Sequence, residues 1–225
     1  DTDKAKIELT SPMPTAKIFY TLDGSEPTEK SAEYTKPFEV TLAANQTKEL
    51  KTVVMTAAGR KSVIFGATIL RRPYLEPVKI SDQDKLVRFS YYKKSFTSVS
   101  EMEKSEPTEK GTTQSILLTQ FAKKQDLKEP FGVIFEGFIN APNDGIYEFQ
   151  VDSDDGAILT IGNETVVDND GLHSFLIKTG LIPLKKGFHQ VRLKYFQGGG
   201  DSSLGLRWGI KGTGLRRIYG NEMVR

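Results

Sequence analysis

The fold is decided by residues 144–161, which read DGIYEFQVDSDDGAILTI. Apolar and polar residues alternate on both sides of the acidic run in the middle of this stretch. The alternating apolar residues are Tyr147, Phe149, Val151, Ala157, Leu159 and Ile161. A period of two places such side chains on one face of a β-strand, and an Asp-Gly pair such as Asp155-Gly156 is typical of a tight turn. We therefore predict two consecutive strands that each bury one face in a core.

The chain on either side of this stretch has the same pattern. Alternating apolar residues recur at Val133, Phe135 and Ile139, at Val191, Leu193 and Tyr195, and at Leu204, Leu206 and Trp208. No amphipathic helix longer than about three turns is indicated. Residues 101–111 are polar and charged, and we expect them to form a surface loop. From about residue 85 onward, the sequence predicts an almost purely β domain.

The N-terminal part of the chain predicts a second, smaller β domain. Residues 17–22, KIFYTL, have the composition of a strand and end at Asp23-Gly24, a tight-turn signal. Further short strands are expected at 51–55 and 62–65. Short strands separated by turns are typical of a small sandwich.

We therefore expect an all-β protein with two β-sandwich domains. The first domain spans residues 1–72 and the second spans residues 85–225. Residues 73–84 are expected to form a linker, because they contain two prolines and a polar run at 81–84.

The composition excludes several classes of protein. The 225 residues include 31 basic and 29 acidic ones, interspersed to a net charge of +2, which gives no basic face for nucleic acid. There is no cysteine, so disulfides, thiolate metal sites and cysteine nucleophiles are excluded. No apolar run approaches the roughly 18 residues of a membrane span, and no signal peptide is evident. The chain begins with Asp1, and we expect it to be a piece of a longer polypeptide.

Residues 18–28, IFYTLDGSEPT, carry the resemblance of the N-terminal domain to a known family. Together with Tyr34, Pro37-Phe38 and residues 59–62, they make residues 5–70 similar to the C-terminal module of chitobiase and β-hexosaminidase. Such modules resemble fibronectin type III sandwiches and lie at the ends of glycoside hydrolases. The resemblance implies a spacer or docking role without chemistry of its own.

An ordered series of motifs carries a second resemblance in the C-terminal domain. The series comprises residues 137–138, 144–149, 153–159, 166–173, 187–189, 195–196 and 204–208. In this order the motifs make residues 84–220 similar to a PA14 domain, a β-sandwich found in glycosidases, adhesins and toxins. Several members of that family bind sugar through calcium, and others are structural, so the resemblance determines the fold better than the function.

The PA14 resemblance singles out Asp154 and Asp155. In lectin-type members, two adjacent aspartates joined by a cis peptide hold a calcium ion that ligates sugar hydroxyls, and calcium takes six to eight oxygen ligands. Those lectins complete the site with an asparagine between the last strands. Here residues 197–202 contain no asparagine, so Asp201 is the candidate third ligand. The alternative is that the Asp-Asp-Gly run only caps its own turn.

A neighbouring polar loop supplies three more candidate residues. Asn169, Asp170 and His173 could line a shared sugar pocket with the two aspartates. The loop is not an EF-hand, because Thr179 stands where that motif needs a bidentate acid. The alternative interpretation is a hydrogen-bonded turn whose side chains hold only the loop itself.

No catalytic residue is predicted. The two histidines have no matching serine or cysteine constellation. Adjacent aspartates also cannot face each other across a glycosidic bond. We expect a non-catalytic accessory region of a glycoside hydrolase, a β-hexosaminidase or a relative, secreted to the periplasm, the cell surface or the medium of a bacterium. Its expected partners are a glycan and the parent catalytic domain, with calcium as the candidate ion and no nucleic acid or membrane span. The alternative is a scaffold that shapes the parent enzyme and has no ligand.

Overall fold

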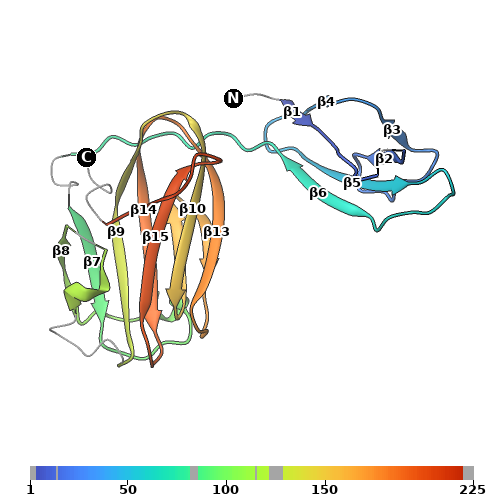
Figure 1. The fold of residues 1–225 in the computed structure, drawn as a ribbon. Coiled ribbons are helices and arrows are strands. Elements are labelled where there is room, and N and C mark those ends of the chain that lie inside the picture. Colours follow the sequence, from blue (N-terminus) through green and yellow to red (C-terminus); the bar gives the residue numbers. More distant parts are fainter. Residues whose placement is uncertain (1–3, 14, 82–85, 115, 122–128, 220–225) are drawn as a thin grey trace. The chain divides into compact units, whose positions relative to one another are not determined.

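The structure, a computed structural model, describes residues 4–13, 15–81, 86–114, 116–121 and 129–219. It divides the chain into two compact units, Asp1–Pro73 and Tyr74–Arg225. Antiparallel strands are the main regular structure of both units, so the predicted all-β class is confirmed (Figure 1). None of the helices within the described ranges is both long enough and apolar enough to cross a membrane.

The described residues of the first unit form six strands of three to nine residues. They are β1 (Lys4–Ile7), β2 (Lys17–Thr21), β3 (Ala32–Tyr34), β4 (Phe38–Thr41), β5 (Thr47–Met55) and β6 (Phe65–Leu70). β1 pairs with β4, and the other four form a sheet in the order β3-β2-β5-β6. Phe19 packs against Val53 and Met55 in the core. Asp23 holds the turn after β2, because its carboxylate accepts a hydrogen bond from the Ser25 amide at 3.0 Å.

Within its described residues, the second unit contains ten strands, one short α-helix and one 3-10 helix. The strands are β7 (Val87–Tyr92), β8 (Glu109–Thr113), β9 (Phe131–Ala141), β10 (Gly145–Asp154), β11 (Ala157–Ile161), β12 (Glu164–Asn169), β13 (Leu176–Leu184), β14 (Gly187–Gln197), β15 (Ser203–Ile210) and β16 (Arg216–Arg217). The helices are α1 (Val99–Glu103) and η2 (Leu118–Phe121). The expected surface loop at 101–111 therefore contains the end of α1 and the start of β8.

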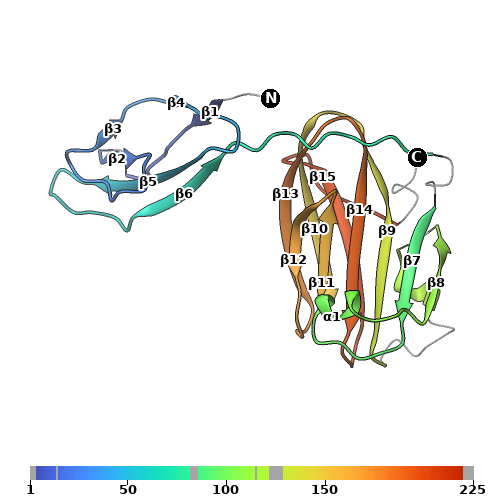
Figure 2. The same cartoon turned by 180° about the vertical axis from the view of Figure 1, so that it is seen from behind.

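Two sheets enclose the core of this unit. The larger sheet has the order β12-β11-β14-β9-β7-β8, and the smaller has the order β13-β10-β15-β16 (Figures 1 and 2). The alternating side chains point inward as predicted: Tyr147 is 1% exposed, and Phe149 and Val151 of β10 are fully buried. Burial of side chains of this size is the main source of stability in such a sandwich.

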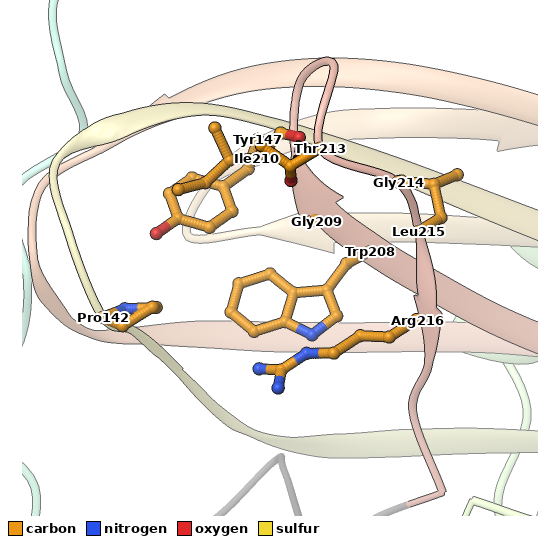
Figure 3. A pocket seen from close by; sticks show the side chains of 9 residues that line it. All are labelled: Pro142, Tyr147, Trp208, Gly209, Ile210, Thr213, Gly214, Leu215 and Arg216. Atoms are coloured by element: carbon orange, nitrogen blue, oxygen red, sulfur yellow. Dashed lines mark hydrogen bonds between the residues drawn. The ribbon is translucent and has the colours of Figure 1, made fainter.

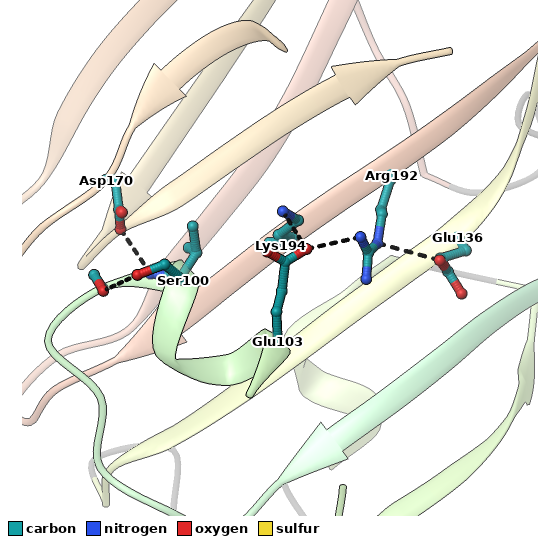
Figure 4. A network of polar contacts seen from close by, with 8 residues as sticks. Ser100, Glu103, Glu136, Asp170, Arg192 and Lys194 are labelled. Carbon is teal, nitrogen blue, oxygen red and sulfur yellow. Dashed lines mark hydrogen bonds and ion pairs between the residues drawn. The ribbon is translucent and has the colours of Figure 1, made fainter. Parts of the chain in front are cut away.

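The helix α1 covers part of the outer face of the larger sheet. Val99 and Met102 of α1 belong to a separate buried cluster with Tyr92, Phe96, Ile134 and Phe196. Glu103, at the end of α1, forms ion pairs with Arg192 and Lys194 of β14, each at 2.8 Å (Figure 4). Apolar packing and ion pairs together hold α1 on the sheet.

The expected linker is partly attached to the second unit. The Leu75 amide donates to the Pro183 carbonyl at 2.9 Å, and the Val78 amide donates to the Phe188 carbonyl at 2.8 Å. These bonds join residues 75–78 to the ends of β13 and β14. The polar run predicted at 81–84 lies largely outside the described residues, which omit 82–85.

Candidate functional site

The two adjacent aspartates lie where three loops of the second unit meet. Asp154 is the last residue of β10, and Asp155 begins the turn to β11. Strand register brings the other two loops to this end, because Ala157 is paired with Asn169 on one side and with Tyr195 on the other. The β12–β13 and β14–β15 loops therefore begin beside the aspartates. The peptide bond between Asp154 and Asp155 is cis.

Asp155 connects the three loops through its carboxylate. Its side chain is buried, with 7% of the residue exposed. One oxygen accepts a hydrogen bond from the His173 amide at 2.9 Å, and the other accepts one from the Gly198 amide at 2.8 Å. A carboxylate that accepts amide hydrogen bonds from two different loops fixes both loops to the turn. This arrangement is the capping role that the sequence left as an alternative.

Asp154 has a different environment from its neighbour. It is half-buried, and burial followed by the charge of Asp155 raises the pKa of its carboxyl group above the ordinary value. The backbone amide of Phe175 opposes this shift, and the charge of Asp201 adds to it. The backbone carbonyl of Asp154 accepts a hydrogen bond from the Tyr195 hydroxyl at 2.5 Å. The charge of His173 also opposes the shift. Asp154 is therefore held through its backbone, and its carboxylate lies near two like charges, one backbone amide and the His173 ring.

The three remaining candidates on the β12–β13 loop have mainly structural contacts. The Asn169 side-chain amide donates to Ser153 Oγ at 2.8 Å and to the Leu176 carbonyl at 3.2 Å. Asp170 Oδ1 accepts from the Val99 amide at 2.9 Å, so it points toward α1 (Figure 4). The His173 ring lies 3.0 Å from the Asn169 carbonyl through Nε2. These contacts are of the kind expected for a hydrogen-bonded turn whose side chains hold the loop itself.

Asp201 lies on the third loop and is exposed. Its backbone carbonyl accepts a hydrogen bond from the Gln197 side chain at 2.8 Å, and its charge reaches Asp154. The structure thus brings Asp154, Asp155 and Asp201 into one electrostatic neighbourhood. In the described part of the chain, none of the three forms an ion pair with lysine or arginine.

The oxygen atoms at this end of the domain determine whether calcium would fit there. No three acidic or histidine side chains converge on a metal position within the described ranges. Each oxygen of Asp155 accepts one amide hydrogen and keeps a second lone pair. Asp154 supplies a second carboxylate, which forms no ion pair with lysine or arginine in the described chain. Hard oxygen ligands of this kind suit calcium, provided that backbone or amide oxygens complete the shell.

Sequence reasoning missed the apolar rim of this end. Leu172 and Phe175 are 59% and 54% exposed, and both lie on the loop that contacts Asp155 and Asp154. Gly198 packs under this rim, since a Cβ there would lie 2.5 Å from Leu172 Cδ2. The sequence signal for this rim was the pair Leu172 and Phe175, which flank His173-Ser174 in an otherwise polar loop.

Comparison with known proteins agrees with this architecture. The PA14 domain model matches residues 79–218, and the model of the chitobiase/beta-hexosaminidase C-terminal domain matches residues 2–66. A beta-hexosaminidase of Porphyromonas gingivalis is 28% identical over 196 residues, which cover 85% of this chain and 24% of that protein. The chain therefore spans about a quarter of the length of this curated relative.

Two solved structures share the fold of the second unit. The PA14 sugar-binding domain from an RTX adhesin is 18% identical with a TM-score of 0.51, covering 63% of this chain and 98% of that one. The A domain of epithelial adhesin 9 from Candida glabrata, solved with Galb1-3GlcNAc, is 11% identical with a TM-score of 0.51, covering 68% and 94%. Both similarities concern the fold. The chain belongs to the PA14 domain family and carries a chitobiase/beta-hexosaminidase C-terminal domain ahead of its PA14 domain.

Proposed function

We propose that this chain is a carbohydrate-binding accessory region of a secreted bacterial glycoside hydrolase, a β-hexosaminidase or a related enzyme, and that it has no catalytic activity of its own. Its glycan site would be the loop end around Asp154 and Asp155. The observation that carries the proposal is the half-buried Asp154 carboxylate, which forms no ion pair with lysine or arginine in the described chain and lies beside an exposed apolar rim. The beta-hexosaminidase relative and the sugar-binding adhesin domains support it.

The chemistry of this end suits a hydroxylated ligand. Carboxylate oxygens accept hydrogen bonds from sugar hydroxyls, and such charge-assisted bonds are stronger than neutral ones. The exposed ring of Phe175 offers an apolar surface for the C–H face of a pyranose. Asp155 would hold the loops in place, and Asp154 would contact the ligand. Asp201 lies on the opposite loop and could accept from a second hydroxyl.

Calcium dependence is the finer part of the proposal. Asp154 and Asp155 would hold the ion, with Asp201 as a further ligand, and the bound calcium would supply open coordination positions for vicinal hydroxyls. Burial and then the charge of Asp155 raise the pKa of Asp154, and a bound cation would relieve the repulsion between these two carboxylates. Asn169 Oδ1 is buried without a hydrogen-bond partner in the described structure, so this loop also holds an uncommitted oxygen.

Titration calorimetry of residues 1–225 tests the proposal. The ligands are N-acetylglucosamine, galactose, mannose and their β-linked disaccharides, each with calcium and with EDTA. We expect a Kd of about 1 mM or tighter for at least one sugar, and at least tenfold weaker binding for Asp154→Asn. Glu148→Gln is the matched control, because it removes one carboxylate from the same strand away from the loops. No heat with any sugar would refute the proposal, whereas binding that survives EDTA would refute only the calcium part.

A second candidate function is a scaffold that shapes the parent enzyme without a ligand. It is favoured by the full engagement of Asp155 with two backbone amides and by the contact of Asp170 with α1. Deletion of residues 74–225 from the parent enzyme separates the two functions. A scaffold predicts altered stability or substrate-size preference with no loss of glycan retention. A binding module predicts weaker retention on insoluble glycan with unchanged turnover of a small soluble substrate.

A further inference from the structure

A cleft of about 460 Å³ lies at the opposite end of the PA14 sandwich from the aspartates. Its walls include Pro142, Tyr147, Trp208, Ile210 and Arg216 (Figure 3). Tyr147 stands near the start of β10, whereas Asp154 ends that strand, so the cleft is separate from the proposed glycan site. The volume falls in the range of small-molecule sites in proteins.

The floor of the cleft is a rigid aromatic pair. The rings of Tyr147 and Trp208 stack with centroids 5.1 Å apart at an interplanar angle of 19°. Both residues are 1% exposed, so neither ring can move freely. The Tyr147 hydroxyl donates to the Asn143 carbonyl at 2.8 Å, which satisfies the polar end of that ring.

Trp208 has no such partner for its polar atom. Its indole Nε1 is buried and lacks a hydrogen-bond acceptor in the part of the chain that the structure describes. A buried N–H group without an acceptor is destabilising, and native structures rarely retain one without a water or a ligand to satisfy it. The indole N–H therefore requires an acceptor that the described side chains do not supply.

Arg216 places a second unpaired donor group on the same wall. Its guanidinium lies 5.4 Å from the centre of the Trp208 ring, and Figure 3 shows it on the side of the indole nitrogen. Among the described residues it forms no ion pair, and no acidic side chain lines the cleft. Burial, and to a smaller extent the charge of Asp144, raises the pKa of Tyr147. Asp144 is therefore the nearby carboxylate, but it accepts a hydrogen bond from the Lys186 amide at 2.7 Å and does not line the cleft. The indole N–H of Trp208 and the guanidinium of Arg216 therefore have no carboxylate beside them among the residues that line the cleft.

We propose that this cleft is a second ligand site, which takes a compact ring bearing a carboxylate. One carboxylate oxygen would accept from the Arg216 guanidinium, since arginine pairs well with planar carboxylates. The other would accept from Trp208 Nε1–H, which the ligand reaches once the guanidinium moves off the indole ring. Pro142 and Ile210 supply apolar contacts for the ring of the ligand. A sugar acid and an aromatic acid both combine a carboxylate with a compact ring. The titrations below distinguish these two classes of ligand.

The only tryptophan of the chain makes the test direct. A ¹⁵N-labelled sample of residues 1–225 has one indole N–H signal, which belongs to Trp208 at the cleft. Glucuronate and benzoate are titrated, with glucuronamide and benzamide as uncharged isosteres. We expect a saturable shift of the indole signal with at least one carboxylate, and at least tenfold weaker binding of the matching amide. Saturation by glucuronate alone identifies a sugar acid, and saturation by benzoate alone identifies an aromatic acid.

Matched variants connect the shift to the proposed contact. Arg216→Gln should weaken carboxylate binding at least tenfold, because it removes the guanidinium and leaves a shorter, uncharged polar side chain. Arg217→Gln is the control, since Arg217 lies over Tyr219 at 5.6 Å and does not line the cleft. Asp154→Asn should leave the titration unchanged, so failure at the glycan site and failure here are distinguishable. An indole signal that no carboxylate moves, or equal losses in the two arginine variants, would overturn the proposal.

Discussion

Substitution of Asp155 by alanine should destabilise the PA14 unit more than substitution of Asp154. Asp155 accepts hydrogen bonds from His173 and Gly198, and its side chain is buried. Hydrogen bonds to a charged group contribute about 1.5–3 kcal/mol each, so the loss of both costs roughly 3–6 kcal/mol. Removal of the charge also relieves its repulsion with Asp154, which offsets part of this loss. The expected net loss for Asp155→Ala is therefore about 2–5 kcal/mol.

Urea denaturation measures this loss directly. Trp208 is 1% exposed in the core of the PA14 unit, so its fluorescence reports the unfolding of that unit. With an m value of about 2 kcal/mol per molar, the midpoint should fall by about 1–2.5 M. Asp154→Ala is the matched control, because Asp154 is half-buried and is disfavoured by its neighbour's charge. We expect it to change the unfolding free energy by less than about 1 kcal/mol. Equal losses in the two variants would refute the division of roles between the aspartates.

Three further substitutions test other contacts of the PA14 unit. The hydrogen bond from Lys194, together with the charges of Lys194 and Arg192 on β14, lowers the pKa of Glu103. These ion pairs therefore stabilise the folded state fully above pH 4.5, and the stabilisation is lost as the pH falls through the lowered pKa. Glu103→Gln should flatten this acid dependence in pH-resolved urea melts, by less than about 1 kcal/mol because the group is exposed. Asp170→Ala should lower the unfolding free energy by about 1 kcal/mol, since the Val99 amide loses its acceptor; an unchanged melting temperature would contradict this. Gly180→Ala places a Cβ 1.7 Å from the Val166 carbonyl oxygen and should cost about 1–3 kcal/mol in the same urea assay, a loss that wild-type stability would disprove.

The fold was largely predictable because burial follows a simple period. Every second residue of β10 and β11 faces the core, and Tyr147, Phe149 and Leu159 are at most 1% exposed. The strand β8, EKGTT, was not predicted, since it has no apolar alternation. It is an edge strand that pairs only with β7, so backbone hydrogen bonds rather than side-chain burial define it.

The candidate site was less predictable than the fold. The sequence indicated that Asp154 and Asp155 share a loop, but it could not separate their roles. The amides that bind Asp155 belong to His173 and Gly198, which are 18 and 43 residues away along the chain. Such pairings depend on how three loops close at the end of two sheets, and no local pattern encodes this closure. For the same reason the sequence left two interpretations of Asp170 open, a sugar pocket and a hydrogen-bonded turn, and it gave no sign of the contact between its carboxylate and α1.

The strand β10 connects the two proposed sites and also keeps them electrostatically apart. Tyr147 contributes to the cleft, and Asp154 stands at the other end of the strand, seven residues later. At a rise of about 3.3 Å per residue, the two ends are roughly 23 Å apart. The Debye length at physiological ionic strength is about 8 Å, so the acidic end and the arginine at the cleft barely influence each other. The double variant Asp154→Asn/Arg216→Gln should therefore be additive in both titrations, within about 0.5 kcal/mol. A larger coupling would mean that the sandwich transmits a structural change along β10, because screened charges at this separation cannot supply it.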